Sequence, residues 1–140
     1  MMSEFDIMNI SATGMSAQRL RVEIVSTNIA NAETTRTETG EPYRRKVPVF
    51  AEYLRKAKDG RIESAGVKVV RIVEDPSPFR LVYDPTHPDA DENGYVRMPN
   101  VNIVREMVDL INAQRAYDAN VAAFNVTKNM VNSALQIGRG

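Results

Sequence analysis

The chain contains no cysteine, and its two ends contain no proline. Without cysteine it can form neither disulfides nor thiolate metal sites, and cysteine nucleophiles are excluded. All seven prolines lie between positions 42 and 99, so the first 41 and the last 41 residues have none. Because proline breaks the interior of a helix, both ends are free to form long helices and the middle is not.

Net charge and long hydrophobic runs are also absent. The 18 basic and 18 acidic residues cancel, so no nucleic-acid or acidic-membrane partner is indicated. No apolar run approaches the roughly 18 residues that a membrane-spanning helix needs, so we expect no direct membrane insertion. The segment Met1 to Asp6 is acidic and lacks a continuous apolar stretch, which excludes a cleaved secretory signal and by that rule alone indicates a cytosolic protein.

We expect an α+β chain with two long terminal α-helices packed as a coiled-coil-like pair and a small central β-rich domain. The predicted parts are an N-terminal axial helix (1–33), a central loop and β-rich region (34–100), and a C-terminal axial helix (101–140). The centre holds twelve basic and eleven acidic residues, whereas the ends are poor in charge. Ends of this kind are typical of surfaces that become buried.

The first predicted helix runs from Phe5 to Ala32, with Ser3 or Asp6 as its cap. Asn31 is expected to close it in a left-handed conformation, and Gly14 weakens it by about 1 kcal/mol relative to alanine. An apolar seam recurs every seven residues along one face: Met8, Met15, Val22 and Ile29.

The middle carries strand signals. Val67–Glu74 and Phe79–Asp84 flank an Asp-Pro-Ser-Pro turn and predict a hairpin. A shorter strand is expected around Val47–Tyr53, with a turn bracketed by Gly60 and Gly66. So short a region makes a thin core, and we expect it to depend on the helices for stability.

The last predicted helix runs from Val101 to Ile137, with Asn100 or Asn102 as its cap and Gly138 as its end. Along this helix, two rows of mainly apolar residues recur every seven positions. They are Ile103, Leu110, Tyr117, Phe124, Val131, and Met107, Gln114, Val121, Lys128, Leu135.

Helices of this length need their apolar faces covered. The two helices cover each other, or the pair also packs against copies of itself or related chains; we favour some burial between chains. Gln18 and Gln114 either fix register inside a seam or face solvent at its edge. The predicted assembly interface comprises Met8, Met15, Val22, Asn28, Ile29, Asn31, Ile103, Met107, Leu110, Gln114, Tyr117, Val121, Phe124, Val131 and Leu135.

Two groups of residues partly match the patterns of metal-binding or catalytic sites. Asp89 to Gly94 matches the first half of a calcium loop, but the twelfth position, which must supply a bidentate glutamate, is Asn100. His87, the only histidine, lies near Asp84 and Asp91, but there is no second histidine and no helical ligand spacing. We therefore expect no catalytic residue, no metal site and no cofactor.

Several segments carry a family resemblance. The segment Ser26–Ala32 resembles the N-terminal signature of flagellar rod and hook axial proteins. The segment Gly94–Asn102, followed by Glu106–Asp109 and Arg115–Asn120, resembles the basal-body rod proteins of the proximal rod, C-type. The resemblance covers nearly the whole chain, with a departure at Thr34–Thr39.

The resemblance implies a structural subunit without catalysis, whose terminal helices polymerise into part of the drive shaft. It implies partners among other rod subunits, copies of itself and basal-body ring and export-gate proteins. It also implies a periplasmic position in the basal body and export through the flagellar type III apparatus, which uses no cleaved signal. Asn28 and Asn31 are expected to position the end of the N-terminal helix against the start of the β region.

Two other functions stay open on the residues alone. A helical-hairpin adaptor or secretion chaperone explains the seams but not the proline-rich centre. A small hydrolase or metal enzyme using Asp84, His87 and Asp91 is the other alternative, which metal analysis would discriminate.

Overall fold

The computed structural model describes residues 3–140; Met1 and Met2, part of the acidic N-terminal segment, lie outside the described residues. Its elements in chain order are α1 (Glu4–Ala30), β1 (Lys46–Lys56), β2 (Ile62–Glu74), β3 (Arg80–Tyr83), β4 (Tyr95–Met98) and α2 (Ile103–Arg139). The α+β class predicted from the sequence is confirmed.

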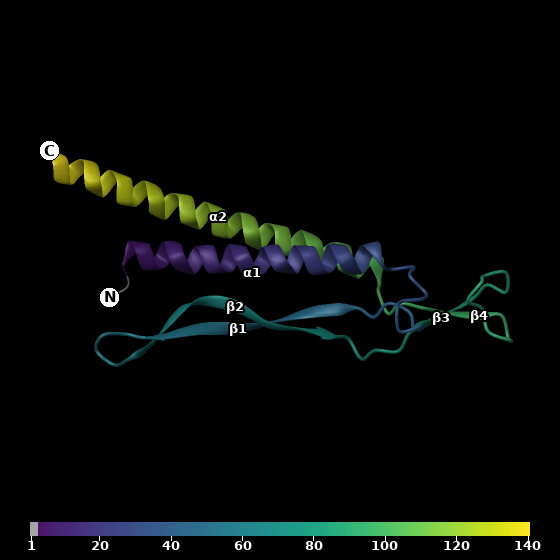
Figure 1. Cartoon of the computed structure of the whole chain (residues 1–140). Helices are drawn as coiled ribbons and strands as arrows, with labels where there is room; N and C mark the ends of the chain where they lie inside the picture. The colour runs from purple at the N-terminus through teal and green to yellow at the C-terminus, as the bar shows by residue number, and fades with distance from the viewer. Residues whose placement is uncertain (1–2) are drawn as a thin grey trace.

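Helix α1 lies in the middle of an elongated molecule (Figure 1). Helix α2 runs back along one side of it, and the long β1–β2 hairpin lies along the other side. The short β3–β4 hairpin extends beyond the end where α1 finishes and α2 begins. The strands therefore form two separate two-stranded antiparallel sheets rather than one central sheet.

The ends of α1 follow local capping chemistry. Ser3 and Asp6 form a capping box, in which the Ser3 hydroxyl accepts from the Asp6 amide and the Asp6 carboxylate accepts from the Ser3 amide. Asn31 closes the helix at φ −104°, so the left-handed closure predicted for it is wrong. Its own amide donates to the Thr27 and Ile29 carbonyls, which satisfies the helix end without a positive φ.

The predicted hairpin across Asp75–Pro78 is wrong. β2 pairs with β1, and β3 pairs with β4. The first hairpin turns at Gly60, whose φ of 87° suits a tight turn. The segment between the two hairpins bends at Ser77, whose amide donates to Asp75 Oδ1, and Pro76 and Pro78 restrict the backbone on either side of the bend.

Gly66 lies inside β2 rather than at a turn. A register shift between Glu52 and Leu54 on the facing strand marks a bulge there. Gly66 has a φ of 124°, and an added Cβ would lie 2.0 Å from the Thr13 hydroxyl oxygen of α1. The Thr13 hydroxyl also accepts from the amide of Val67 at 3.2 Å. The glycine thus lets the hairpin approach α1 and fixes their relative register.

Helix α2 begins at Ile103 with Asn102 as its N-cap, one of the two predicted caps. It continues through Gly138 to Arg139, so the predicted end at Gly138 is wrong. The glycine is exposed and its φ is not positive, so it acts here as an ordinary helical residue.

Helices α1 and α2 meet through small side chains. On α1, Ser11 and Gly14 are buried. On α2, Ala113 is fully buried and Thr127 is 7% exposed. A Cβ on Gly14 would lie 2.6 Å from the Asn120 side-chain oxygen. Gly14 therefore permits close approach of the helices, which offsets its low helix propensity.

Candidate assembly interface

A polar junction joins α1, β1 and α2 where the three meet. Asn28, fully buried, donates from Nδ2 to the Lys46 carbonyl at 2.8 Å and to Glu106 Oε2 at 3.1 Å. Its Oδ1 accepts from the Lys46 amide at 3.0 Å and from the Tyr43 hydroxyl at 2.7 Å. The Asn28 side chain of α1 is therefore hydrogen-bonded to both β1 and α2. The predicted contact of Asn28 with the start of the β region is confirmed.

Glu106 is the charged member of this junction, and its side chain is 1% exposed. Arg45, at the start of the β region, donates from Nε to its carboxylate. The same guanidinium contacts Asp75 Oδ2 at 3.2 Å and Asp109 Oδ2 at 3.4 Å. A buried carboxylate is stable only when it is paired and hydrogen-bonded, and Glu106 meets both conditions.

Charges and burial at the junction shift three pKa values. Burial raises the pKa of the Tyr43 hydroxyl, and the negative charges of Glu106 and Glu74 raise it further. Burial is the largest single influence on Arg45 and opposes its charge, but the hydrogen bonds and negative charges of Glu106 and Asp75 together outweigh it and raise its pKa. The hydroxyl and amide of Ser77 lower the pKa of Asp75, assisted by Arg45. At neutral pH Arg45 and Asp75 are therefore charged, and the Tyr43 hydroxyl is neutral and can donate its hydrogen bond to Asn28.

The predicted seam residues of α1 are only half-buried within the chain: Met8, Met15, Val22 and Ile29. The buried positions of α1 are offset from them. The Asn31 side chain makes its hydrogen bonds elsewhere than to β1: its Nδ2 donates to the Thr27 carbonyl, and its Oδ1 accepts from the Thr34 hydroxyl. It shapes the end of the helix, whereas Asn28 makes the contact to the strand.

In the first predicted row of α2, four residues are half-buried and one is exposed. Half-buried positions that recur at sevens are Leu110, Tyr117, Phe124 and Val131. Ile103, at the start of the row, is 39% exposed.

The second predicted row is largely open. Met107 is 49% exposed, Leu135 is 62% exposed, and Gln114 is exposed and hydrogen-bonded to Asp118. Val121 is half-buried, and Lys128 is exposed. Gln114 therefore lies at a solvent-facing edge, and Gln18 is half-buried beside Arg21.

Helix α2 has a second, separate apolar face that the heptad rows do not predict. At 100° per residue it lies roughly opposite the α1 contact, and every member is exposed. We call it the outer stripe: Val104, Val108, Ile111, Ala119, Ala122, Val126, Met130 and Ile137. Its three- and four-residue steps, interrupted at Arg115, were visible in the sequence, but the heptad rows drew attention to the other face.

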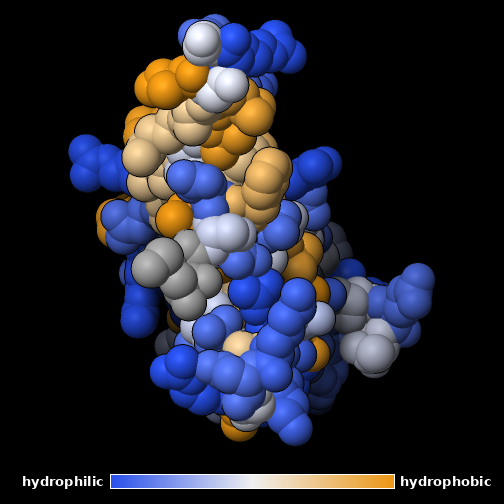
Figure 2. Space-filling view, turned by 90° about the vertical axis from the view of Figure 1, so that its left-hand side faces the viewer, coloured by the Kyte–Doolittle hydropathy of each residue, from blue (hydrophilic) through white to orange (hydrophobic). Residues whose placement is uncertain are grey.

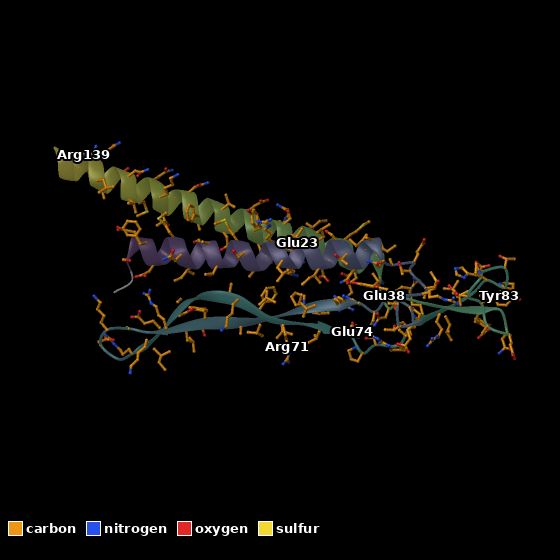
Figure 3. All side chains as sticks on the ribbon, in the orientation of Figure 1. Glu23, Glu38, Arg71, Glu74, Tyr83 and Arg139 are labelled. Carbon is orange, nitrogen blue, oxygen red and sulfur yellow. The ribbon has the colours of Figure 1, made fainter. Side chains whose placement is uncertain are left out.

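The apolar face is open to solvent. Val104 is 72% exposed, Ile111 57% and Ile137 81%. An end-on view shows apolar side chains gathered at the C-terminal end of α2 (Figure 2). Figure 3 places Arg139, the last residue of α2, beyond the first turn of α1. A continuous apolar face that is open to solvent makes this side of α2 the candidate assembly interface.

The acidic segment that resembled a calcium loop forms turns. Asp91 Oδ1 accepts from the Asn93 and Tyr95 amides, and Asp89 is bound by Thr35 and Arg36. His87 Nδ1 accepts from the Asp89 amide. Across residues 3–140 no cluster of His, Cys, Asp and Glu has the arrangement to hold a metal ion.

No helix among the described residues combines the length and the apolarity needed to cross a membrane.

Comparisons with known proteins match both ends of the chain and then its whole length. Residues 8–36 match the family described as "Flagella basal body rod protein", and residues 92–137 match "Flagellar basal body rod FlgEFG protein C-terminal". A protein of Bacillus subtilis (strain 168) named "Flagellar basal-body rod protein FlgC" is 47% identical, covering 99% of this chain and 100% of its own length. Proteins of the same name from Borreliella burgdorferi and Salmonella typhimurium are 45% and 39% identical over the same shares. This chain therefore belongs to the family of flagellar basal-body rod proteins.

Proposed function

We propose that this chain, a structural subunit of the flagellar basal-body rod, polymerises by burying the outer stripe of α2 against neighbouring subunits. The proposed place is the proximal rod, as part of the drive shaft. The curated relatives bear the name of a rod protein, so an adaptor or secretion chaperone is not favoured. We assign the chain no catalytic role and no cofactor.

The proposed neighbours are copies of this chain and other rod subunits, with basal-body ring and export-gate proteins at the rod base. The proposed location is the periplasmic part of the basal body, reached through the flagellar type III apparatus. Nucleic acid and direct membrane insertion have no part in the proposal.

One observation carries this proposal: α2 is apolar on two opposite faces, and α1 covers only one. Helices that are apolar around much of their circumference are stable in water only when both faces are buried. The outer stripe and the exposed positions Ile103, Met107 and Leu135 together form the surface that neighbours would cover. The half-buried α1 seam would be completed in the same way.

The hydrogen bonds of Asn28 and Glu106 fix the orientation of α2, and so of its outer stripe, relative to α1 and the hairpin. They hold the start of α2 against the end of α1 and the start of β1. Because the exposed α2 face and the hairpin are different surfaces of one subunit, a contact between them is head-to-tail and need not close. A contact of this type propagates a helical tube, and we infer that the terminal helices become fully ordered as it forms.

Ile111→Asp tests the proposal. Ile111 is 57% exposed in the outer stripe, so a charge there leaves the isolated chain's unfolding free energy within about 0.5 kcal/mol. In the assembled rod the same carboxylate would be buried without a partner. We expect motility and rod recovery to be lost, measured by swimming assays and by isolating basal bodies.

Asn125→Asp is the matched control, because it adds the same charge to an exposed position of α2 outside the stripe. Leu110 and Phe124 are less suitable targets, since both are half-buried in the chain itself. Normal rods from Ile111→Asp would refute the proposed surface, as would equal loss from Asn125→Asp.

A further inference from the structure

The last turns of α2 differ from the rest of the helix, because no part of α1 lies beside them. Helix α2 has 37 residues and α1 has 27, and the C-terminal end of α2 projects beyond α1 (Figure 1). Leu135 continues the face that elsewhere contacts α1, and Ile137 continues the outer stripe. With Met130 and Ala134 between them, the apolar arc spans roughly half of the helix circumference. A wide arc of this kind fits a concave partner better than a flat one.

The chain has a concave apolar surface on the other side of α1. A groove of about 700 Å³ lies between α1 and the β1–β2 hairpin. Apolar side chains from both walls line it: Ile10, Ala17, Leu20, Tyr53, Val67 and Val69. Four further hollows on the described part of the chain are smaller, at about 240 to 400 Å³.

The charges of the two surfaces are compatible. After Asp118 the chain contains no acidic residue, and the α2 end carries Lys128 and Arg139. The groove begins beside the acidic first turn of α1, which holds Glu4 and Asp6.

The two cations in the groove wall are already engaged within the chain. Arg55 pairs with Asp6 at 2.7 Å and with Glu63 at 3.6 Å. The Lys68 ammonium lies 5.2 Å from the centre of the Tyr53 ring. Two carboxylates therefore offset the charge of Arg55, whereas Lys68 keeps its positive charge. The acidic residues Glu4, Asp6 and Glu63 still outnumber these two cations around the groove, which favours a basic helix end.

The chain cannot fill its own groove. Helix α2 lies on the side of α1 opposite the hairpin, and its end points away from the molecule (Figure 1). We propose that the last turns of α2 from one copy, around Leu135 and Ile137, occupy the α1–hairpin groove of a second copy. The inference rests on the proposed function and names the site at which one subunit holds the next. Because donor and acceptor surfaces differ, each copy can accept one neighbour and donate to another.

Cysteine cross-linking tests this contact without background, since the chain has no cysteine. One copy carries Leu135→Cys, and a second carries Ser16→Cys or Ser64→Cys, exposed serines on the two groove walls. Both copies are co-expressed in cells that lack their own, and isolated basal bodies are oxidised. We expect disulfide-linked dimers of this chain with at least one groove position, because bridging requires Cα atoms within about 7 Å.

Arg71→Cys on the outer face of the hairpin is the matched control. Arg71 is exposed, lies outside the groove lining, and points away from α1 (Figure 3). Equal cross-linking of Leu135→Cys to Arg71→Cys would overturn the proposal. The proposal would also be overturned if the cysteines at positions 16 and 64 react with a thiol reagent but form no disulfide-linked dimer of this chain, or if they cross-link only to a different protein. If rods assemble normally in those cases, this inference fails while the proposed function stands; if the chain is absent from rods, both fail.

Discussion

Replacement of Glu106 by glutamine tests the junction that fixes the direction of α2. The substitution preserves shape but removes the charge that pairs with Arg45, and its amide can offer only one acceptor oxygen. Arg45 Nε and Asn28 Nδ2 both donate to this carboxylate, one to each oxygen. In the glutamine variant one of these two donors therefore faces the new NH₂ group and loses its acceptor. A buried unsatisfied donor costs about 1–3 kcal/mol, and a lost charged hydrogen bond about 1.5–3 kcal/mol.

Arg45 keeps Asp75 and Asp109 and is 18% exposed, so part of the loss is recovered. We therefore expect Glu106→Gln to lower the free energy of unfolding by about 3 kcal/mol. Urea unfolding of the purified full chain, followed by circular dichroism, measures this. Glu38→Ala, an exposed position in the loop after α1, is the control and should change stability by less than about 0.5 kcal/mol.

A double-mutant cycle with Arg45→Met separates the pair from the surrounding contacts. In the Arg45→Met background, Glu106→Gln should cost clearly less, because the buried carboxylate has already lost its partner. The reasoning is refuted if Glu106→Gln costs under about 1 kcal/mol, or if the two changes are additive.

Three further predictions concern packing and pH. Gly14→Ala should destabilise the chain by about 1–2 kcal/mol in urea unfolding, because the new Cβ meets Asn120, and the change should become stabilising in an Asn120→Ala background. Gly66→Ala should cost more than about 2 kcal/mol by the same assay, since both its φ of 124° and its contact with α1 forbid a side chain; an unchanged urea midpoint would contradict this. The lowered pKa of Asp75 contributes stability that is present above its ordinary value of 3.8 and lost as pH falls below it. Ser77→Ala, which removes the largest cause of that shift, should therefore reduce the difference between urea midpoints at pH 7 and pH 3; an equal or larger difference would contradict this.

Local chemistry explains which parts of the fold could be predicted from the sequence. Proline placement and capping residues define both helices, because these effects act within a few residues. Strand pairing could not be predicted in the same way. The runs around Val67–Glu74 and Phe79–Asp84 are neighbours in sequence, yet each pairs with a different strand. The choice of partner depends on contacts between residues far apart in the sequence, which a local turn signal does not contain.

The interface was predicted less completely than the fold, for a physical reason. Heptad rows of large side chains predict a seam, but α1 and α2 meet through Gly14, Ala113 and Thr127, which such rows overlook. Asn28 was expected to position the β region, whereas the buried role of Glu106 was not, because burial of a charge depends on Arg45, far away in the sequence.

The central claim is that the outer stripe of α2, exposed in one subunit, is covered by its neighbours in the rod. Ile111→Cys places a single thiol in that stripe, and its rate of reaction with a maleimide measures accessibility directly. We expect rapid labelling of the purified subunit, strong protection in isolated basal bodies, and recovery of labelling when those basal bodies are dissociated. Equal labelling rates in the subunit and in the intact basal body would contradict the account.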